Sequence, residues 1–252
     1  FFSSLGGTEY YNALLAEKLS VRGIEVKIFS GEKPRLAYWQ KLLKAKGLEI
    51  ISPDEFHEDK SLRDIERHFV TKITNHFRIW EPDVIHCHPA GKLLLSWFEL
   101  NERPQVPVVA TEWTTPSELT SHWFLPEIEN FHANIKAYIA PCEAVYDGIR
   151  HYHGYKGEVR IIPHLIMPPL NEPENPINGA NISVGCVSRF AVEKGLDFLI
   201  GAWVKVVKSV PQATLHLYGH GPDEQRLKEM SQCLGIKNSV HFEGVFQPLT
   251  GI

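Results

Sequence analysis

Two basic residues, Arg189 and Lys194, stand five positions apart, directly after an apolar segment that we expect to form a strand over residues 182–187. In open α/β sheets ligands bind at the carboxyl ends of the parallel strands. Two cations that converge there form a favourable pocket for a diphosphate. Glu193 lies between them in the sequence, so a surface pair neutralised by this carboxylate is the alternative interpretation.

A glycine loop follows the next predicted strand, over residues 213–218, and precedes a predicted helix over 222–234. Its backbone N–H groups could cradle a phosphate or a sugar, and its histidine could hydrogen-bond a ligand. The loop consists of Gly219, His220, Gly221 and Pro222. It also looks like the start of a dinucleotide fingerprint, with Glu243 where an acidic ribose ligand would stand, but Glu224 replaces the third glycine and would oppose a pyrophosphate.

A second glycine pair, Gly6 and Gly7, opens the first predicted helix, over residues 8–21. Glycines at such a position let backbone N–H groups approach an anion, and the positive end of the helix dipole favours negative charge. A plain tight turn explains the same residues. The pair is therefore a candidate phosphate site that needs support from elsewhere in the chain.

Polar residues also end two strands in the first half of the sequence. His86 and His88 share one face of the strand expected over residues 83–88, and we take His88, nearer the tip, as the candidate catalytic residue. Zinc would need a third ligand, and none stands at a diagnostic spacing. One or both histidines could instead be structural. Glu112 and Trp113 follow the strand over 106–111 and could supply a catalytic carboxylate and a stacking platform for a sugar, although a Trp there is as often core.

Strands alternate with helix-length segments along the whole chain, which predicts parallel sheets covered by helices on both faces. We expect an acceptor-side, Rossmann-like domain over residues 1–167, a proline-rich linker over 168–181 and a partial nucleotide-sugar-binding domain over 182–252. Further strands are expected over residues 25–30, 48–51, 137–141, 159–163 and 240–242, and further helices over 36–46, 62–80, 92–100, 144–152 and 195–208.

Composition bounds the class of protein. The 252 residues are 43% hydrophobic and 22% charged, with a net charge of −4, which favours a globular protein and argues against disorder and nucleic-acid binding. The four cysteines form no CxxC pair, as in a reduced, cytoplasmic protein. No apolar run is long enough for a transmembrane helix. The basic, aromatic segment 33–44 is compatible with contact at the inner membrane face, but packing of Leu36, Trp39 and Leu43 on a sheet is the simpler interpretation.

Taken in order, these motifs resemble the family 4 retaining glycosyltransferases of the GT-B fold, the group 1 glycosyl transferases. The matching stretches include Val187-Ser188-Arg189, Glu193-Lys194-Gly195-Leu196-Asp197 and Gly219-His220-Gly221-Pro222. Others lie at residues 6–9, 15–26, 82–88, 161–164 and 240–244. The order and spacing of these parts are more specific than any one glycine loop.

The resemblance implies an α/β protein of GT-B type, with two Rossmann-like parallel-sheet domains that face a cleft. It implies hexosyl transfer with retention from a nucleotide-diphosphate sugar to a glycan, lipid or small-molecule acceptor, without metal or bound cofactor. Arg189 and Lys194 would hold the donor diphosphate, with Gly7 completing the site from the other domain. Gly244 and Val245 would lie near the base.

Three departures from the family pattern stand out. Trp113 replaces a histidine, and Ser188 replaces a glycine before the arginine. The glutamate-rich donor motif would follow Ile252, and a first strand would precede Phe1. We therefore expect a second domain that is incomplete and a chain that is inactive by itself.

Two other functions are compatible with the same motifs. A sugar-nucleotide epimerase of this fold would use the same diphosphate clamp, and a non-catalytic module would bind a nucleotide sugar or glycan without transfer. NAD-dependent redox chemistry ranks behind both, because of Glu224.

Overall fold

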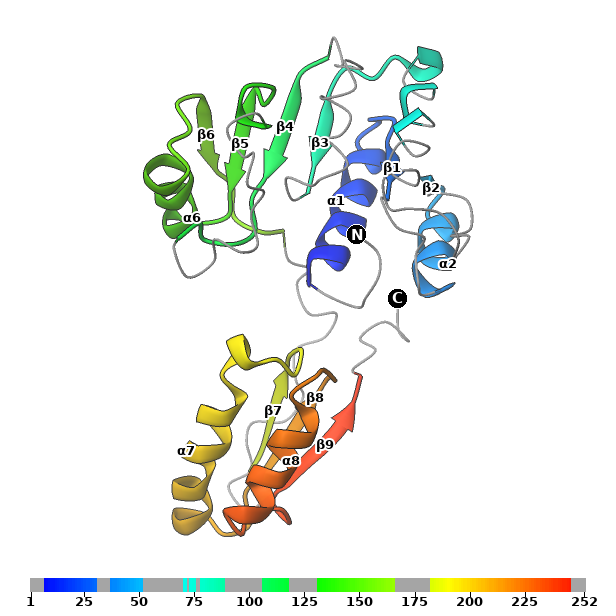
Figure 1. The fold of residues 1–252 in the computed structure, drawn as a ribbon. Helices are drawn as coiled ribbons and strands as arrows, with labels where there is room; N and C mark the ends of the chain where they lie inside the picture. Colours follow the sequence, from blue (N-terminus) through cyan, green and yellow to red (C-terminus); the bar gives the residue numbers. More distant parts are fainter. Residues whose placement is uncertain are drawn as a thin grey trace, which may run out of the picture. The chain divides into compact units, whose positions relative to one another are not determined.

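The computed structural model divides the chain into two compact units, unit 1 over Phe1–Met167 and unit 2 over Pro168–Ile252. It describes residues 7–30, 37–51, 70–71, 73–75, 78–88, 106–117, 131–165 and 182–245. The predicted helix over 92–100 and the glycine Gly6 lie outside these ranges, and the predicted helix over 62–80 lies partly outside them. Figure 1 shows the elements of each unit.

Unit 1 contains a four-stranded parallel sheet in the order β3-β4-β5-β6. Val108 and Ala110 alternate along β4 and are buried with Tyr138 of β5 and Ile149, because side chains two apart in a strand face the same way. The strands are β3 (Ile85–Cys87), β4 (Val108–Thr111), β5 (Ala137–Ala140) and β6 (Glu158–Ile161). The helix α6 (Glu143–Asp147) and the π-helix η2 (Gly148–Tyr152) follow β5.

A separate two-stranded parallel sheet joins β1 (Lys27–Phe29) to β2 (Glu49–Ile51). Sequence periodicity identifies strands but not the partners with which they pair, so the division of the described strands into two sheets was not predicted. The helices α1 (Gly7–Val21) and α2 (Ala37–Ala45) pack with it. Trp39 and Leu43 of α2 are 1% and 0% exposed, so the side chains that a membrane-bound helix would insert are core residues.

Unit 2 contains a three-stranded parallel sheet of β7 (Ser183–Val187), β8 (Thr214–Tyr218) and β9 (Val240–Gly244), in that order. The helices α7 (Leu196–Ser209) and α8 (Glu224–Cys233) lie on one face of it (Figure 1). Successive right-handed crossovers in one direction place both helices on the same side. Their apolar residues meet Leu215 and Leu217 of β8 in one core.

The other face of this sheet is polar. His216 of β8 contacts Thr214 and the Glu243 carboxylate of β9, and its ring stacks on His241 at a centroid distance of 4.9 Å. The prediction of helices on both faces is thus wrong for the described part of unit 2. Three strands with two connections in one direction can cover one face only.

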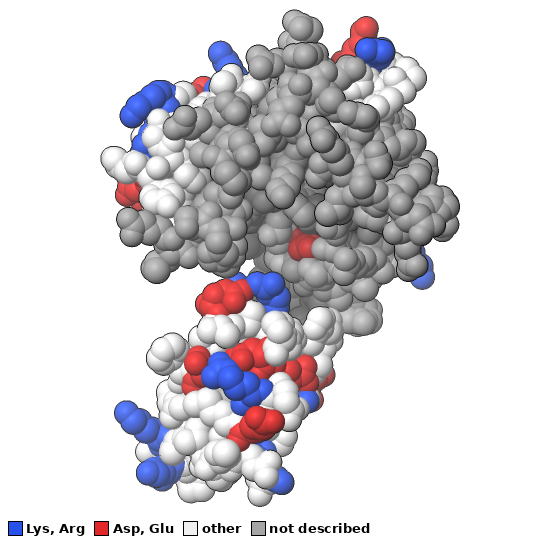
Figure 2. Space-filling view, viewed as in Figure 1, with Lys and Arg blue, Asp and Glu red and all other residues white. Residues whose placement is uncertain are grey.

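Charged side chains of both signs are interspersed over the face of unit 2 that Figure 2 shows. A ligand of this unit must therefore be recognised by the local arrangement of groups rather than by a broad field of one sign. In the residues that the structure describes, no helix is long and apolar enough to cross a membrane.

Candidate functional site

Five aromatic or imidazole side chains from different elements of unit 1 gather at one edge of the four-stranded sheet. We call them the ring cluster: Tyr11, His86, His88, Trp113 and His164. His88 follows β3, Trp113 follows β4 and His164 follows β6, while Tyr11 comes from α1. Because parallel strands present their carboxyl ends at one edge, three separate strands deliver their next residues to the same place.

Each ring of the cluster contacts at least one other ring. The centroids of His86 and His88 lie 3.9 Å apart, as expected for residues on one face of the chain. Trp113 meets Tyr11 edge-on at 4.9 Å and lies 4.6 Å from His164. His88 lies 5.9 Å from Trp113. The cluster therefore combines the candidate catalytic histidine with the candidate sugar platform.

Burial keeps His86 of β3 and His88, which follows it, neutral. It lowers the pKa of His86 to about 4, and it lowers the pKa of His88 to about 2, where the neighbouring His86 adds to the effect. His86 shares a hydrogen bond of 2.7 Å between its Nε2 and Thr111 Oγ1. A neutral imidazole can accept or donate a hydrogen bond but holds no proton to give as an acid at neutral pH.

Two polar atoms of the cluster have no hydrogen-bond partner among the described residues, namely His88 Nδ1 and Trp113 Nε1. Buried polar atoms nearly always have a hydrogen-bond partner, so these two atoms call for an explanation. The imidazole Nδ1 can accept or donate a hydrogen bond, and the indole Nε1 can donate one. Together they match the hydroxyl groups of a neutral polyol.

The carboxylate of Glu112 is turned back on its own loop. Its Oε1 accepts the backbone N–H groups of Trp113 at 2.8 Å and Thr114 at 3.1 Å, and the residue is 3% exposed. Burial raises the pKa of Glu112 to about 7, against these two hydrogen bonds, which lower it. The arrangement fixes the backbone that carries Trp113 and gives the carboxyl group a proton near neutral pH.

The same loop is held from its other end by Pro116. A Cβ added to Gly148 at the start of η2 would lie 2.5 Å from the Pro116 Cδ atom, so only glycine permits this approach. Pro116 itself is buried. The loop that presents Trp113 is therefore fixed both by the Glu112 carboxylate and by a close backbone contact.

Two members of the cluster, Tyr11 and His164, were not predicted as site residues. Tyr11 fitted the apolar face of a helix, which the 3.6-residue period cannot separate from a site. His164 could have been found, because it follows a strand of the same sheet, as His88 and Trp113 do. Gly7 is the first residue of α1 and is exposed, one residue earlier than the predicted helix start.

Unit 2 carries the second group of candidate residues on two loops, the β7 loop (188–195) and the β8 loop (219–223). The backbone N–H of Phe190 donates to His220 O at 2.9 Å, and that of Asp223 donates to Phe190 O at 3.0 Å. Phe190 is fully buried between them. These bonds tie the two loops together at the carboxyl ends of their strands.

The glycines of the β8 loop are required by this contact. A Cβ on Gly219 would lie 1.9 Å from Ser188 O, and one on Gly221 would lie 2.2 Å from Phe190 O. Gly219 also has a φ of +143°, which other residues rarely adopt. The glycines are therefore needed first for the contact between the two loops, and only then as a source of backbone N–H groups for a phosphate or sugar.

Arg189 and Lys194 both lie on the β7 loop and both are exposed. Arg189 Nη2 makes an ion pair with Glu193 Oε1, as the alternative interpretation anticipated. Lys194 ends the 3-10 turn η3 (Val192–Lys194) and stands before α7 rather than in it. Arg189 lies two residues after β7 and Lys194 ends the turn, so the guanidinium and ammonium groups are carried by the same short loop.

The last candidates, Gly244 and Val245, end β9 and follow it, and both are exposed. Gly244 O accepts the Gly219 N–H at 2.6 Å, which brings the end of β9 beside the β8 loop. Pro222 and His220 are exposed on that loop. Glu243 is engaged by His216 Nδ1 at 2.7 Å on the polar face of the sheet.

Among the residues that the structure describes, no group of three or more His, Cys, Asp or Glu side chains is placed to hold a metal ion. The zinc interpretation of His86 and His88 therefore finds no third ligand in the described ranges. Arg189 and Lys194 are the two cations of the β7 loop.

Comparison with known families gives two matches. Residues 5–167 match the family described as Glycosyltransferase Family 4, and residues 169–247 match Glycosyl transferases group 1. A curated relative, alpha-monoglucosyldiacylglycerol synthase of Streptococcus pneumoniae, is 25% identical in an alignment of 193 positions that covers 67% of this chain and 43% of that protein. The chain spans 12% to 43% of the lengths of the curated relatives that it matches.

Two solved structures share the fold. The lipopolysaccharide outer core galactosyltransferase WaaB matches with a TM-score of 0.63 and 16% identity, over 97% of this chain and 66% of that one. The UDP-GlcNAc 2-epimerase of Neisseria meningitidis, bound to UDP-GlcNAc, matches with a TM-score of 0.61 and 11% identity, over 96% of this chain and 70% of that one. At these identities the likeness concerns the fold, which is that of the GT-B proteins.

Proposed function

The chain belongs to the glycosyltransferases of family 4 and group 1, and on that premise we propose that it is part of a retaining hexosyltransferase. The donor is a nucleotide-diphosphate sugar, and the acceptor is a hydroxyl group of a glycan, a lipid or a small molecule. Unit 2 binds the donor and unit 1 binds the acceptor.

One observation carries the donor assignment. The β7 and β8 loops are interlocked at the carboxyl ends of parallel strands, and the β7 loop carries both Arg189 and Lys194. Such a position, with two cations beside glycine backbone, suits a diphosphate. Similarity to a protein that binds UDP-GlcNAc supports a nucleotide sugar as the ligand.

Arg189 must exchange one anion for another when the donor binds. Its present partner is the Glu193 carboxylate on the same loop, and this pair is solvent-exposed, so it costs little to break. As the glycosidic bond breaks, negative charge grows on the departing phosphate oxygens. Arg189 and Lys194 stabilise that charge and so act on the transition state, which makes a metal ion unnecessary for this step.

In unit 1 the ring cluster provides the acceptor side. His88 Nδ1 and Trp113 Nε1, which have no partner in the part of the chain that the structure describes, are offered to sugar or polyol hydroxyl groups, and Trp113 offers an aromatic face to a pyranose ring. Because the His88 imidazole is neutral, its role is to orient a hydroxyl group by hydrogen bonding. Glu112, with a pKa of about 7, positions Trp113 and is the group here that can take up a proton near neutral pH.

Epimerisation of a nucleotide sugar is the second candidate, since a UDP-GlcNAc 2-epimerase shares the fold over 96% of this chain. The family matches favour transfer, because both name glycosyltransferases. The two reactions differ in their products, so one assay separates them.

The test is incubation of the chain with UDP- and GDP-hexoses, with and without a mixture of sugar and lipid acceptors, followed by NMR of the products. Transfer predicts that UDP or GDP binds to the chain and that whatever turnover occurs releases the nucleotide, with the α-anomeric configuration kept from an α-linked donor. Interconversion of the sugar without nucleotide release would favour epimerisation. If UDP and GDP did not bind and no nucleotide was released, the proposed function would be overturned.

A further inference from the structure

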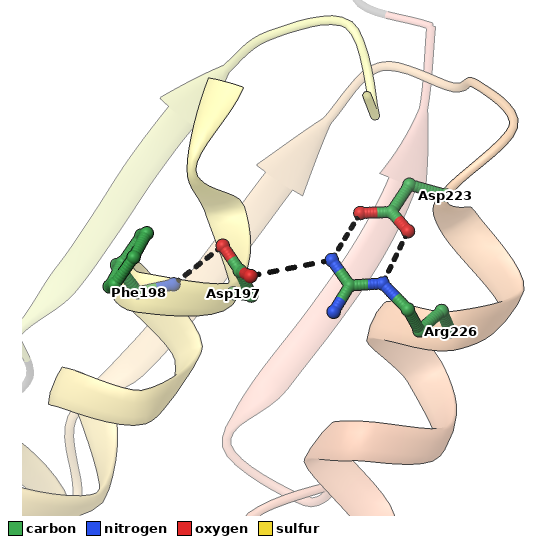
Figure 3. A network of polar contacts seen from close by, with 4 residues as sticks. All are labelled: Asp197, Phe198, Asp223 and Arg226. Carbon is green, nitrogen blue, oxygen red and sulfur yellow. Dashed lines mark hydrogen bonds and ion pairs between the residues drawn. The ribbon is translucent and has the colours of Figure 1, made fainter. Parts of the chain in front are cut away.

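A three-residue ionic clasp joins the first turns of the two helices that follow the donor loops. Arg226 of α8 donates from Nε to Asp223 Oδ1 at 2.5 Å and from Nη2 to Asp223 Oδ2 at 2.6 Å (Figure 3). The same Nη2 reaches Asp197 Oδ2 of α7 at 3.5 Å. Asp197 Oδ1 in turn accepts the Phe198 backbone N–H at 2.9 Å.

Asp223 places this clasp on the donor loops. It is the last residue of the β8 loop, its side chain is 8% exposed, and its backbone N–H donates to Phe190 O of the β7 loop. Asp197 lies three residues after Lys194, in the first turn of α7. Arg226 therefore connects the end of one loop to the helix that directly follows the other.

A second ion pair on α8 shows what a simple surface pair looks like. Lys228 Nζ lies 2.6 Å from Glu224 Oε1, four residues away on the same helix, and 5.4 Å from the centroid of the Phe242 ring of β9. That pair links α8 to itself, whereas the Arg226 clasp links α8 to α7. The geometry also differs, because a bidentate guanidinium–carboxylate contact fixes orientation and an ammonium contact does not.

Charge gives the clasp a second effect. Asp197 and Asp223 place two carboxylates near the amino ends of α7 and α8, where an anionic ligand of the adjoining loops would also be attracted. Arg226 neutralises part of this negative charge. Its removal would leave the two carboxylates to repel each other and the incoming diphosphate.

We propose that Arg226 is a positioning residue of the donor site: by binding Asp197 and Asp223 together, it fixes the spacing of the β7 and β8 loops for the diphosphate. This inference rests on the proposed donor-binding function of unit 2. Arg226 acts through the two aspartates and the loops, and it does not touch the donor itself.

The experiment is calorimetric titration of the chain with UDP and GDP, well below the unfolding temperature, for wild type, Arg226→Ala, Arg226→Lys and the matched control Lys228→Ala. We expect Arg226→Ala to weaken nucleotide affinity about tenfold, Arg226→Lys about threefold, and Lys228→Ala less than twofold. Adding Asp197→Asn to Arg226→Ala should recover about half of the loss in log affinity, because it removes the unpaired carboxylate. Unchanged affinity in Arg226→Ala, whatever its melting temperature, would overturn the proposal.

Amide hydrogen exchange of the ligand-free chain tests the positioning separately from nucleotide binding. Peptides over 188–195 and 219–223 should exchange about tenfold faster in Arg226→Ala than in wild type or Lys228→Ala. Equal exchange in all three would reject the clasp. If wild type bound neither nucleotide while this exchange difference was present, the proposed function would fail and the positioning role would stand.

Discussion

In unit 1 the candidate site consists of neutral rings that, apart from the exposed His164, are buried or half-buried, whereas in unit 2 it consists of exposed loops with ionised side chains. The ring cluster holds His86 and His88 with lowered pKa values and a Glu112 carboxyl group with a raised one, all because of burial. In unit 2 the pKa of Glu193 is lowered, first by its backbone hydrogen bond and also by Arg189, so ionisation is favoured. Burial suits recognition of neutral hydroxyl groups, and exposed charge suits capture of an anion.

The largest expected difference between the units is their response to acid. His86 and His88 have folded pKa values below the usual 6.5, so the folded state resists protonation and stability is lost as pH falls below about 6.5. By pH 4 this costs about 3 kcal/mol per ring. Glu112 takes up a proton between about pH 7 and 4.5, and this stabilises the folded state and offsets about 3 kcal/mol of that loss. We expect unit 1 to lose stability by pH 4 before unit 2 does.

Urea unfolding at pH 7.5 and 4, read by pulsed hydrogen exchange of peptides from each unit, measures this. In the variant His86→Gln, the loss of stability on acidification that comes from the two histidines should be about half that of wild type. The side chain of His151 is 81% exposed, so the control His151→Gln should behave as wild type. Equal loss of stability in both units on acidification would contradict the comparison.

The second prediction concerns the loop contact in unit 2. Gly219→Ala would force a Cβ to within 1.9 Å of Ser188 O, so we expect unit 2 to lose about 3 kcal/mol or more while unit 1 is unaffected. Gly185→Ala is the matched control, because its Cβ would lie 3.9 Å from the nearest atom, in Tyr218. Chemical denaturation gives both values. A stable Gly219→Ala protein would show that the loops are not interlocked as described.

The third prediction concerns the buried carboxyl group of unit 1. The pKa of Glu112 is raised, so ionisation destabilises the folded state and stability falls as pH rises from about 4.5 through 7. Glu112→Gln keeps an oxygen to accept both N–H groups and removes the charge. We expect it to be more stable than wild type by about 2–3 kcal/mol at pH 8 and similar at pH 5. Glu112→Ala should be less stable at both, since it leaves two backbone donors unpaired. An identical pH dependence of wild type and Glu112→Gln would contradict this.

The fourth prediction concerns affinity. Arg189→Ala and Lys194→Ala should each weaken UDP or GDP binding by about 1.5–3 kcal/mol, or about 10- to 100-fold, since each removes a charge-assisted contact. Lys208→Ala, an exposed lysine in the last turn of α7, is the control and should bind as wild type. Full affinity in both loop variants would remove the diphosphate assignment.

The positions of the β7 and β8 loops can be predicted from the sequence, but the tertiary contacts between them cannot. That Arg189 and Lys194 follow a strand, and that Gly219 and Gly221 follow the next, is readable from periodicity and glycine spacing. The interlocking of these loops through Phe190 is a tertiary contact with no local signature. Arg226 was missed for the same reason, because an i,i+3 pair on one helix does not reveal its third partner on another.

In unit 1 the residues after strands could be predicted, but their surroundings could not. His88 and Trp113 were identified by position, whereas the approach of Tyr11 depends on how α1 packs against the sheet. The inward turn of Glu112 depends on burial of a carboxyl group, which sequence alone would place at the surface. The chemistry of that site is set by packing, and the chemistry of unit 2 by local sequence.

The most direct test of the account is hydrogen exchange of the wild-type chain with and without saturating UDP or GDP. We predict protection by one nucleotide over residues 188–195 and 219–223 of unit 2, and loss of that protection in the Arg189→Ala/Lys194→Ala double variant. No protection by either nucleotide, or protection that persists in the double variant, would contradict the claim that unit 2 is the donor-binding half of a glycosyltransferase.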